Sequence, residues 1–163
     1  MSARITTGQD SKQDYGTPLA LFRQIQKHFD FGLDLAAHGG NHKCERWYGR
    51  GGEVEDCFSV PWMPLEGGKW YWLNPEYSDI AKWYRPLSAR PLGSKVVSLV
   101  PMDSAAAWFD FVPGHAGIWH LQGRIKFDGA DQSCAKDCAL HIWDKSRVGE
   151  FRVWNWKKDK FLI

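Results

Sequence analysis

The 163-residue sequence has no long hydrophobic run. No stretch approaches the roughly 20 consecutive apolar residues that a membrane-spanning helix needs. Residues 1–15 are polar, and they contain no apolar segment of the kind found in signal peptides. We therefore expect no membrane association, and a cytoplasmic location is the default expectation.

Cysteine is scarce, with four in the chain, which argues against a disulfide scaffold. His38, His42 and Cys44 lie close together in the sequence and Cys57 follows, so their residue types suit zinc. Their spacing matches none of the usual finger or ribbon patterns, so no metal site is predicted. The favoured interpretation of the cysteines is free thiols in or near the core.

The sequence also lacks a strong charge of either sign. Its net charge is +2 and its pI is near 8.3, so a polyanionic partner must be met by a local basic patch. Aromatic residues are plentiful instead. Ten tryptophans and an aromatic fraction of 15% can supply stacking surfaces or a dense core.

The order of the apolar segments predicts one α/β domain. Residues 1–13 have almost nothing to bury, which predicts a flexible N-terminal arm, and residues 14–163 then form the folded domain. Short strand-like runs alternate with segments of helical spacing. Strands are expected at 29–37, 70–73, 95–101 and 116–121, with a short helix in 102–111 capped by Asp103 or Ser104, and with a closing antiparallel hairpin of 139–143 and 150–156 at the sheet edge.

The most specific chemistry lies in residues 69–83. The short, bulky run Trp70-Tyr71-Trp72-Leu73 predicts a buried strand, and the chain then breaks at Asn74-Pro75 before helical spacing resumes. Polar side chains at the end of such a strand point into the crevice where open α/β sheets bind ligands. The alternative is an ordinary strand-end turn, because Asn and Pro are common turn formers.

Asn74-Pro75-Glu76-Tyr77 resembles the Asn/Asp-Pro-Pro-Tyr signature of amino-methyltransferases. The following Ser78, and a tryptophan at position 83, resemble the phage-type DNA N6-adenine methyltransferase (Dam) family. The resemblance implies a single Rossmann-like methyltransferase domain at 14–163, with a mixed, mostly parallel sheet and helices on both faces. One departure is that Glu76 stands where the family has a second proline, which adds a negative charge and relaxes the backbone.

The resemblance also implies a reaction, namely methyl transfer from S-adenosylmethionine to N6 of an adenine flipped out of DNA. The side-chain oxygen of Asn74 and the carbonyl of Pro75 would accept the two N–H bonds of the amine, and Tyr77 would stack on the base. Glu76 belongs to the same catalytic motif. Asn74 counts among the cofactor contacts as well.

Two further segments resemble the family's cofactor-binding motifs. Tyr15, Thr17 and Pro18 match an aromatic-x-Thr-Pro motif that lies against the cofactor, although Thr17 as N-cap and Pro18 at the first helical position also predict an ordinary helix start. Asp34 with Ala36 resembles the cofactor-binding strand end, where an acid accepts hydrogen bonds from a nucleoside. The alternative is that Asp34 caps a helix. The crevice is expected between the strand ends near residues 33 and 73.

DNA contacts are expected from three places in the sequence. Arg46 lies in a segment that mixes basic and aromatic residues, which suits a nucleic-acid backbone but equally suits a surface strand. Arg124 and Lys126 alternate with apolar residues in a segment that resembles the family's Gly-Arg-Ile/Leu-x-Phe, and this cationic face suits phosphates. Ser78 completes the set by its place in the family signature.

A second hypothesis remains open beside the methyltransferase. Glu76 and the absence of the broader Gly-x-Gly signature favour a catalytically silent methyltransferase-like protein that binds nucleic acid or a protein partner. An aromatic-rich sugar-binding module is disfavoured by the α/β pattern. A monomer is the default expectation for the oligomeric state.

Overall fold

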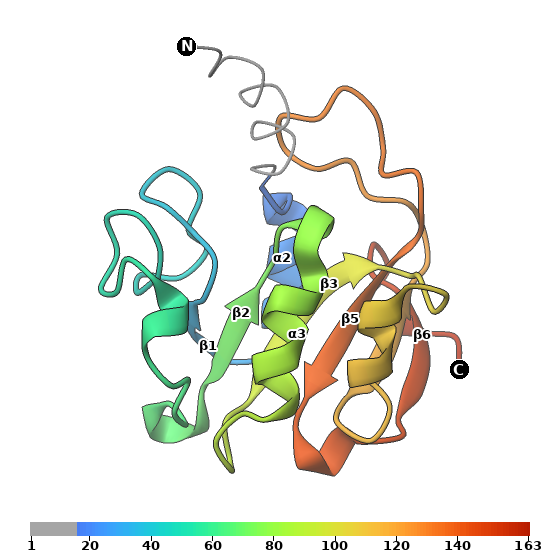
Figure 1. The fold of residues 1–163 in the computed structure, drawn as a ribbon. Helices are drawn as coiled ribbons and strands as arrows, with labels where there is room; N and C mark the ends of the chain where they lie inside the picture. Colours follow the sequence, from blue (N-terminus) through green and yellow to red (C-terminus); the bar gives the residue numbers. More distant parts are fainter. Residues whose placement is uncertain (1–15) are drawn as a thin grey trace.

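A seven-stranded sheet forms the centre of the protein, as seen in a computed structural model that describes residues 16–163 (Figure 1). Its spatial order is β1-β2-β3-β5-β4-β6-β7. The short apolar runs of the sequence supply the central strands, since every residue of β2 and β5 is buried. The strands are β1 (Phe31–Asp34), β2 (Trp70–Leu73), β3 (Val96–Pro101), β4 (Gly117–Leu121), β5 (Cys138–Trp143), β6 (Phe151–Asn155) and β7 (Lys160–Phe161).

The sheet is mixed, as predicted, but it is not mostly parallel in its pairing. The pairs β1–β2, β2–β3 and β4–β6 are parallel, and the pairs β3–β5, β4–β5 and β6–β7 are antiparallel. It follows that β5 and β7 run opposite to the other five strands. The carboxyl ends of β1, β2, β3, β4 and β6 therefore share one edge of the sheet.

The predicted closing hairpin is wrong. β5 does not pair with β6, because it lies between β3 and β4 in the middle of the sheet, and β6 pairs with β4 instead. The apolar sequence of β5 is explained by this central position, where both faces are covered. Such a long-range insertion is not visible in the local sequence pattern.

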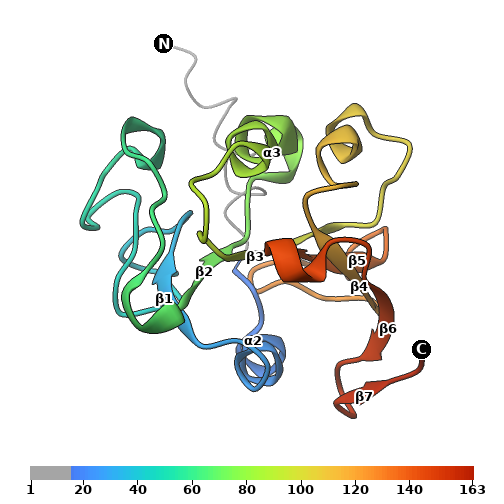
Figure 2. The same ribbon diagram turned by 90° about the horizontal axis from the view of Figure 1, so that it is seen from below.

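Helix α2 (Leu19–Gln26) and helix α3 (Ile80–Ser88) lie on opposite faces of the sheet (Figure 2). Leu21, Phe22 and Ile25 of α2 pack into the core on one face. The buried side chains of α3 pack into the core on the other. Within residues 16–163 these are the only two α-helices, and neither is long and apolar enough to cross a bilayer.

The helix expected in residues 102–111 is shorter and of a different type. The chain forms a 3-10 helix, η4 (Ala107–Phe111), whose N-cap residue is Ala106 and receives no side-chain cap. Asp103 does not cap it, because its carboxylate pairs with Lys136. The expectation that Asp103 or Ser104 caps this helix is therefore wrong.

A buried polar network ties α3 to the sheet. The hydroxyl of Tyr84 lies 2.9 Å from Oγ of Ser98 in β3 and 2.7 Å from Nδ1 of His141 in β5. Trp143 Nε1 donates to the same Ser98 oxygen at 3.0 Å. Burial lowers the pKa of His141 to about 3, so the ring is neutral at physiological pH. The network satisfies the buried hydroxyls of Tyr84 and Ser98 and the Trp143 N–H, whereas His141 Nε2 has no hydrogen-bond partner among residues 16–163.

Tyr84→Phe removes the central hydroxyl of this network, and we expect it to lower the free energy of unfolding by about 1–3 kcal/mol. The reason is that Ser98 and His141 stay buried and lose a partner. Urea denaturation measures the change. Tyr48→Phe, which leaves the network intact, is the control and should change stability by less than about 0.5 kcal/mol. Equal effects of the two substitutions would contradict this role of the network.

Candidate active site

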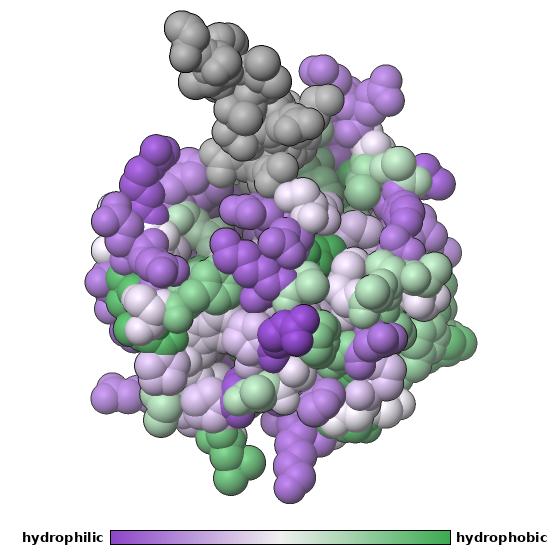
Figure 3. Space-filling view, in the orientation of Figure 1, coloured by the Kyte–Doolittle hydropathy of each residue, from purple (hydrophilic) through white to green (hydrophobic). Residues whose placement is uncertain are grey.

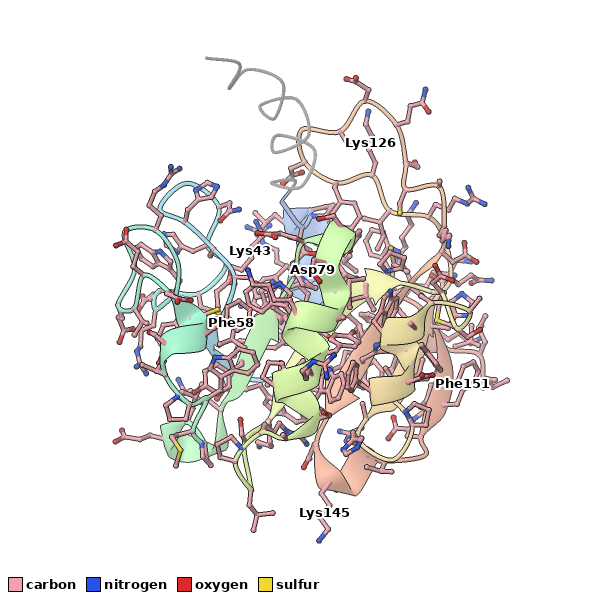
Figure 4. The ribbon with its side chains drawn as sticks, viewed as in Figure 1. Lys43, Phe58, Asp79, Lys126, Lys145 and Phe151 are labelled. Carbon is pink, nitrogen blue, oxygen red and sulfur yellow. The ribbon has the colours of Figure 1, made fainter. Side chains whose placement is uncertain are left out.

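A pocket of about 250 Å³ opens at the carboxyl ends of β1 and β2. This is the place predicted from the sequence. One wall is the long β1–β2 connection, residues 35–69, and the opposite wall comes from the segment after β2 and from α3. Lys43 and Phe58 of the first wall are labelled in the view with side chains, as is Asp79, the N-cap residue of α3 (Figure 4). The residues lining the pocket include Thr17, Asp34, Ala36, Lys43, Asn74 and Glu76.

Asp34 at the end of β1 shapes the first wall. Its carboxylate is buried, and it accepts hydrogen bonds from the backbone N–H of Ala36 at 3.2 Å and of Lys43 at 2.9 Å. It therefore holds both ends of the loop between them. Burial raises the pKa of Asp34 to about 6, although these two N–H groups oppose the rise, so the group is mainly ionised at neutral pH. No helix follows Asp34, and the alternative that it caps a helix is wrong.

Thr17 holds the amide of Asn74. α2 starts at Leu19 with Pro18 as its N-cap residue and no side-chain cap, so the prediction that Thr17 caps this helix is wrong. Thr17 is instead 1% exposed, and its Oγ1 accepts a hydrogen bond from Asn74 Nδ2 at 3.1 Å. Because the amide nitrogen is directed at Thr17, the amide oxygen lies on the other side of the group. Both residues line the pocket.

Tyr77 lies beside the pocket, outside its lining. Its hydroxyl donates a hydrogen bond to the carbonyl of Leu99 in β3 at 3.2 Å, and its ring meets the edge of Phe127 at a centroid distance of 5.8 Å. Burial holds the pKa of Tyr77 well above its ordinary value. The phenol is therefore neutral, and its ring is fixed between β3 and the loop 122–137.

Three of the four residues predicted to bind DNA lie on two loops that project from this end of the molecule (Figure 1), where hydrophilic side chains cover much of the surface (Figure 3). Arg124 and Lys126 are exposed while Ile125 and Phe127 are buried, which confirms the predicted alternation although the segment is not a strand. Arg124 lies 3.8 Å from a carboxylate oxygen of Asp137.

Arg46 lies on the other loop and has a partner of its own. Its guanidinium donates to both carboxylate oxygens of Glu53, at 2.7 and 3.0 Å. Its charge is therefore matched within the loop. Ser78, next to Tyr77, is exposed.

The comparison with known families now decides the assignment. Residues 4–146 match the family described as DNA N-6-adenine-methyltransferase (Dam). The chain belongs to this family. No curated protein matches the sequence. The Dam match covers β1 to β5 and ends in the 3-10 helix η5 (Lys145–Arg147), so β6 and β7 lie beyond it.

Glu76, which the sequence resemblance aligns with a second proline, has a backbone angle that a proline could adopt. Its φ is −63°, which is the angle that a proline ring imposes. Pro75 before it is buried, whereas Glu76 is exposed at the margin of the pocket. The substitution therefore changes the charge beside the pocket and leaves the course of the chain unaltered. The expectation that glutamate relaxes this backbone stays a prediction, since the angle shows the conformation adopted and not the freedom around it.

Several pocket residues were not found from the sequence. Lys82 of α3 lines the pocket with its ammonium 4.9 Å from the ring centroid of Phe58, and Lys43 lines it from the loop. The helical spacing after Pro75 placed Trp83 on the buried side, and Lys82 next to it could have been found from the same spacing. Lys43 could not, because the Asp34 contact that positions it is seen only in the fold.

The remaining expectations concern a metal site, the cysteines and Tyr15. Within residues 16–163, no three histidine, cysteine or acidic side chains gather in a way that could hold a metal ion. His42 bonds the carbonyl of Cys44 at 2.6 Å and stacks on Trp47 at a centroid distance of 4.0 Å, so it organises its own loop. Cys44, Cys57, Cys134 and Cys138 are free thiols, as predicted. Tyr15, predicted to contact the cofactor, lies outside the described residues.

We expect Glu76→Pro to fold and to raise the free energy of unfolding by about 0.4–1 kcal/mol. The reason is that proline restricts the unfolded chain while the native φ is already suitable. Chemical denaturation measures the change, with Glu76→Ala as the control that removes the charge without adding the ring. A loss of stability in the proline variant alone would show that this backbone cannot accept the family residue.

Proposed function

We propose that this Dam-family chain transfers a methyl group from S-adenosylmethionine to the N6 amino group of an adenine flipped out of DNA. The observation that carries the proposal is the Asn74 amide at the end of β2, held by Thr17 on the margin of a pocket that also contains Asp34. Family membership supplies the reaction class. The geometry supplies residues that suit each part of it.

The pocket suits the cofactor. Asp34 is a buried, mainly ionised carboxylate at a strand end, and each oxygen has acceptor capacity beyond the one backbone N–H that it receives. It can therefore accept hydrogen bonds from the ribose or amino groups of S-adenosylmethionine. Ala36 and Thr17 line the same pocket, and Pro18 follows directly. When bound there, the cofactor supplies an electrophilic methyl group on a sulfonium.

The protein's task is to make a poor nucleophile reactive. The lone pair of an exocyclic amine is delocalised into the base ring. Hydrogen bonds from the amine to Asn74 Oδ1 and to the Pro75 carbonyl favour a tetrahedral nitrogen and stabilise the positive charge that develops during transfer. Neither oxygen is basic enough to keep a proton, so the surplus proton of the methylated amine leaves to water.

The flipped base needs a surface to stack on, and we assign this role to Tyr77, three residues after Asn74 and beside the pocket. The bond from its hydroxyl to the Leu99 carbonyl anchors the ring, so little conformational entropy is lost on stacking. Arg124, Lys126 and Ser78 are exposed near this edge and suit the DNA backbone. Arg46 is expected to contribute less, because Glu53 already matches its charge.

The catalytically silent relative is the second candidate. The observation that favours it is the negative charge of Glu76 at the pocket margin, where an anionic polymer would approach. The proline-like φ of Glu76 argues the other way, since the geometry of the signature is retained. We therefore favour the enzyme.

The proposal is tested by incubating the protein with duplex DNA and S-adenosylmethionine labelled in the methyl group. Digestion of the DNA to nucleosides should release labelled N6-methyladenine. Asn74→Ala should lower the rate by about 10²–10³-fold, the effect of removing one preorganised hydrogen-bonding group. Asn74→Asp keeps an acceptor oxygen that the family signature also allows, and it should retain most of the activity.

Two results would reject the enzyme. The silent relative would be selected if calorimetry shows no binding of S-adenosylmethionine and the DNA acquires no labelled methyl group. Full activity of Asn74→Ala would show that the amide has no part in the reaction.

A further inference from the structure

The β6–β7 hairpin, residues 151–161, adds a feature that the family match does not cover, because that match ends at residue 146. β6 runs parallel to β4, which places its carboxyl end at the same sheet edge as the pocket. The turn that follows, residues 156–159, leaves this edge on the face of the sheet that α2 covers, because Asp159 of the turn bonds His28 just beyond α2 (Figure 2). We propose that this turn, which we call the hairpin tip, is a second DNA-binding element that holds the backbone of duplex DNA several base pairs from the target adenine.

The hairpin tip is fixed to the loop that carries Arg124 and Lys126. Asn155 at the end of β6 donates a hydrogen bond from Nδ2 to the side-chain oxygen of Gln122 at 2.7 Å. The backbone N–H of Gln122 donates to the carbonyl of Trp154 at 2.9 Å. The tip and the start of the 122–137 loop therefore form one continuous surface.

The hairpin tip carries two lysines against a single acid, and that acid is directed at its own scaffold. Asp159 accepts hydrogen bonds from His28 Nε2 at 2.7 Å and from Trp154 Nε1 at 3.1 Å, and the bond from His28 lowers the pKa of Asp159. Lys157 and Lys158 are both exposed, and the backbone N–H of Lys158 is fixed by Asn155 Oδ1 at 3.0 Å. The Lys157 ammonium lies 5.6 Å from the ring centroid of Trp156, and Asp159 stays ionised, so the tip keeps a net positive charge on an ordered backbone and complements phosphates.

The distance from the pocket to the hairpin tip sets the footprint. The sheet order places β6 four strands away from β2, and at about 4.8 Å per strand this gives an offset of about 19 Å. Successive phosphates of one strand are about 3.4 Å apart along the duplex axis, so the tip reaches a backbone about five to six base pairs from the pocket. Only a stiff duplex keeps such an offset, and we therefore assign double-stranded DNA as the ligand. This inference rests on the proposed function, which places the target adenine at the pocket.

The test compares Lys157→Gln/Lys158→Gln with wild type in the full chain, using fluorescence anisotropy with labelled duplex DNA over a range of salt concentrations. Loss of two phosphate contacts should reduce the slope of log affinity against log salt by about 1.8. The matched control is Lys69→Gln/Lys145→Gln. It removes two exposed lysines that lie before β2 and after β5, hence at the opposite edge, where Lys145 extends away from the molecule (Figure 4). The control should leave the slope unchanged.

Duplex length gives a second readout once the methylated adenine is mapped. The Lys157→Gln/Lys158→Gln variant, called the hairpin variant, should bind a duplex with about eight base pairs on each side of that adenine more weakly than wild type does. It should bind a duplex with about two base pairs on each side as well as wild type does. Equal salt slopes for the hairpin variant and wild type would overturn the proposal. So would a variant that loses as much affinity for single-stranded DNA as for duplex DNA. A wild-type protein that does not bind duplex DNA would also overturn it. DNA binding without methyl transfer would reject the proposed function alone, and the salt slope would still decide the role of the hairpin tip.

Discussion

The hydrogen bond from Asn74 to Thr17 joins two parts of the chain that are 57 residues apart, and the candidate site depends on it. Asn74 is carried by the end of β2 and Thr17 by the segment before α2, so each is positioned by a different element. Their contact closes the pocket on one side and sets the direction of the amide. An amide that could rotate freely would present its nitrogen and its oxygen equally to an incoming amine, and it would give little preorganisation.

Asp34 makes the opposite wall by a similar principle. A buried carboxylate is costly, and here two backbone N–H groups compensate for part of that cost while the same bonds close the loop 35–43. The residue thus combines a structural task with an acceptor placed at a strand end. The parallel alignment of β1 with β2 brings Asp34 and Asn74 to the same edge, so the sheet itself assembles the site.

Much of this arrangement could be predicted from local sequence. The bulky run before Asn74 and the spacing after it identified β2 and α3, and the acid at the end of β1 located the pocket. The insertion of β5 between β3 and β4 could not be predicted, because strand neighbours are chosen by long-range packing. The same holds for Thr17, whose local pattern predicted a helix cap while its partner comes from β2. The inward hydroxyl of Tyr77 likewise depends on β3.

The central claim is that Thr17 orients the Asn74 amide for methyl transfer, and the most direct measurement is the turnover number of Thr17→Val against Thr17→Ser at saturating DNA and cofactor. Valine keeps the shape but cannot accept the amide N–H, so turnover should fall by up to about tenfold, corresponding to the loss of about 1.4 kcal/mol. Serine keeps the oxygen and should remain close to wild type, with turnover compared at a cofactor concentration that saturates each variant. Equal turnover of the valine variant and wild type would contradict the account.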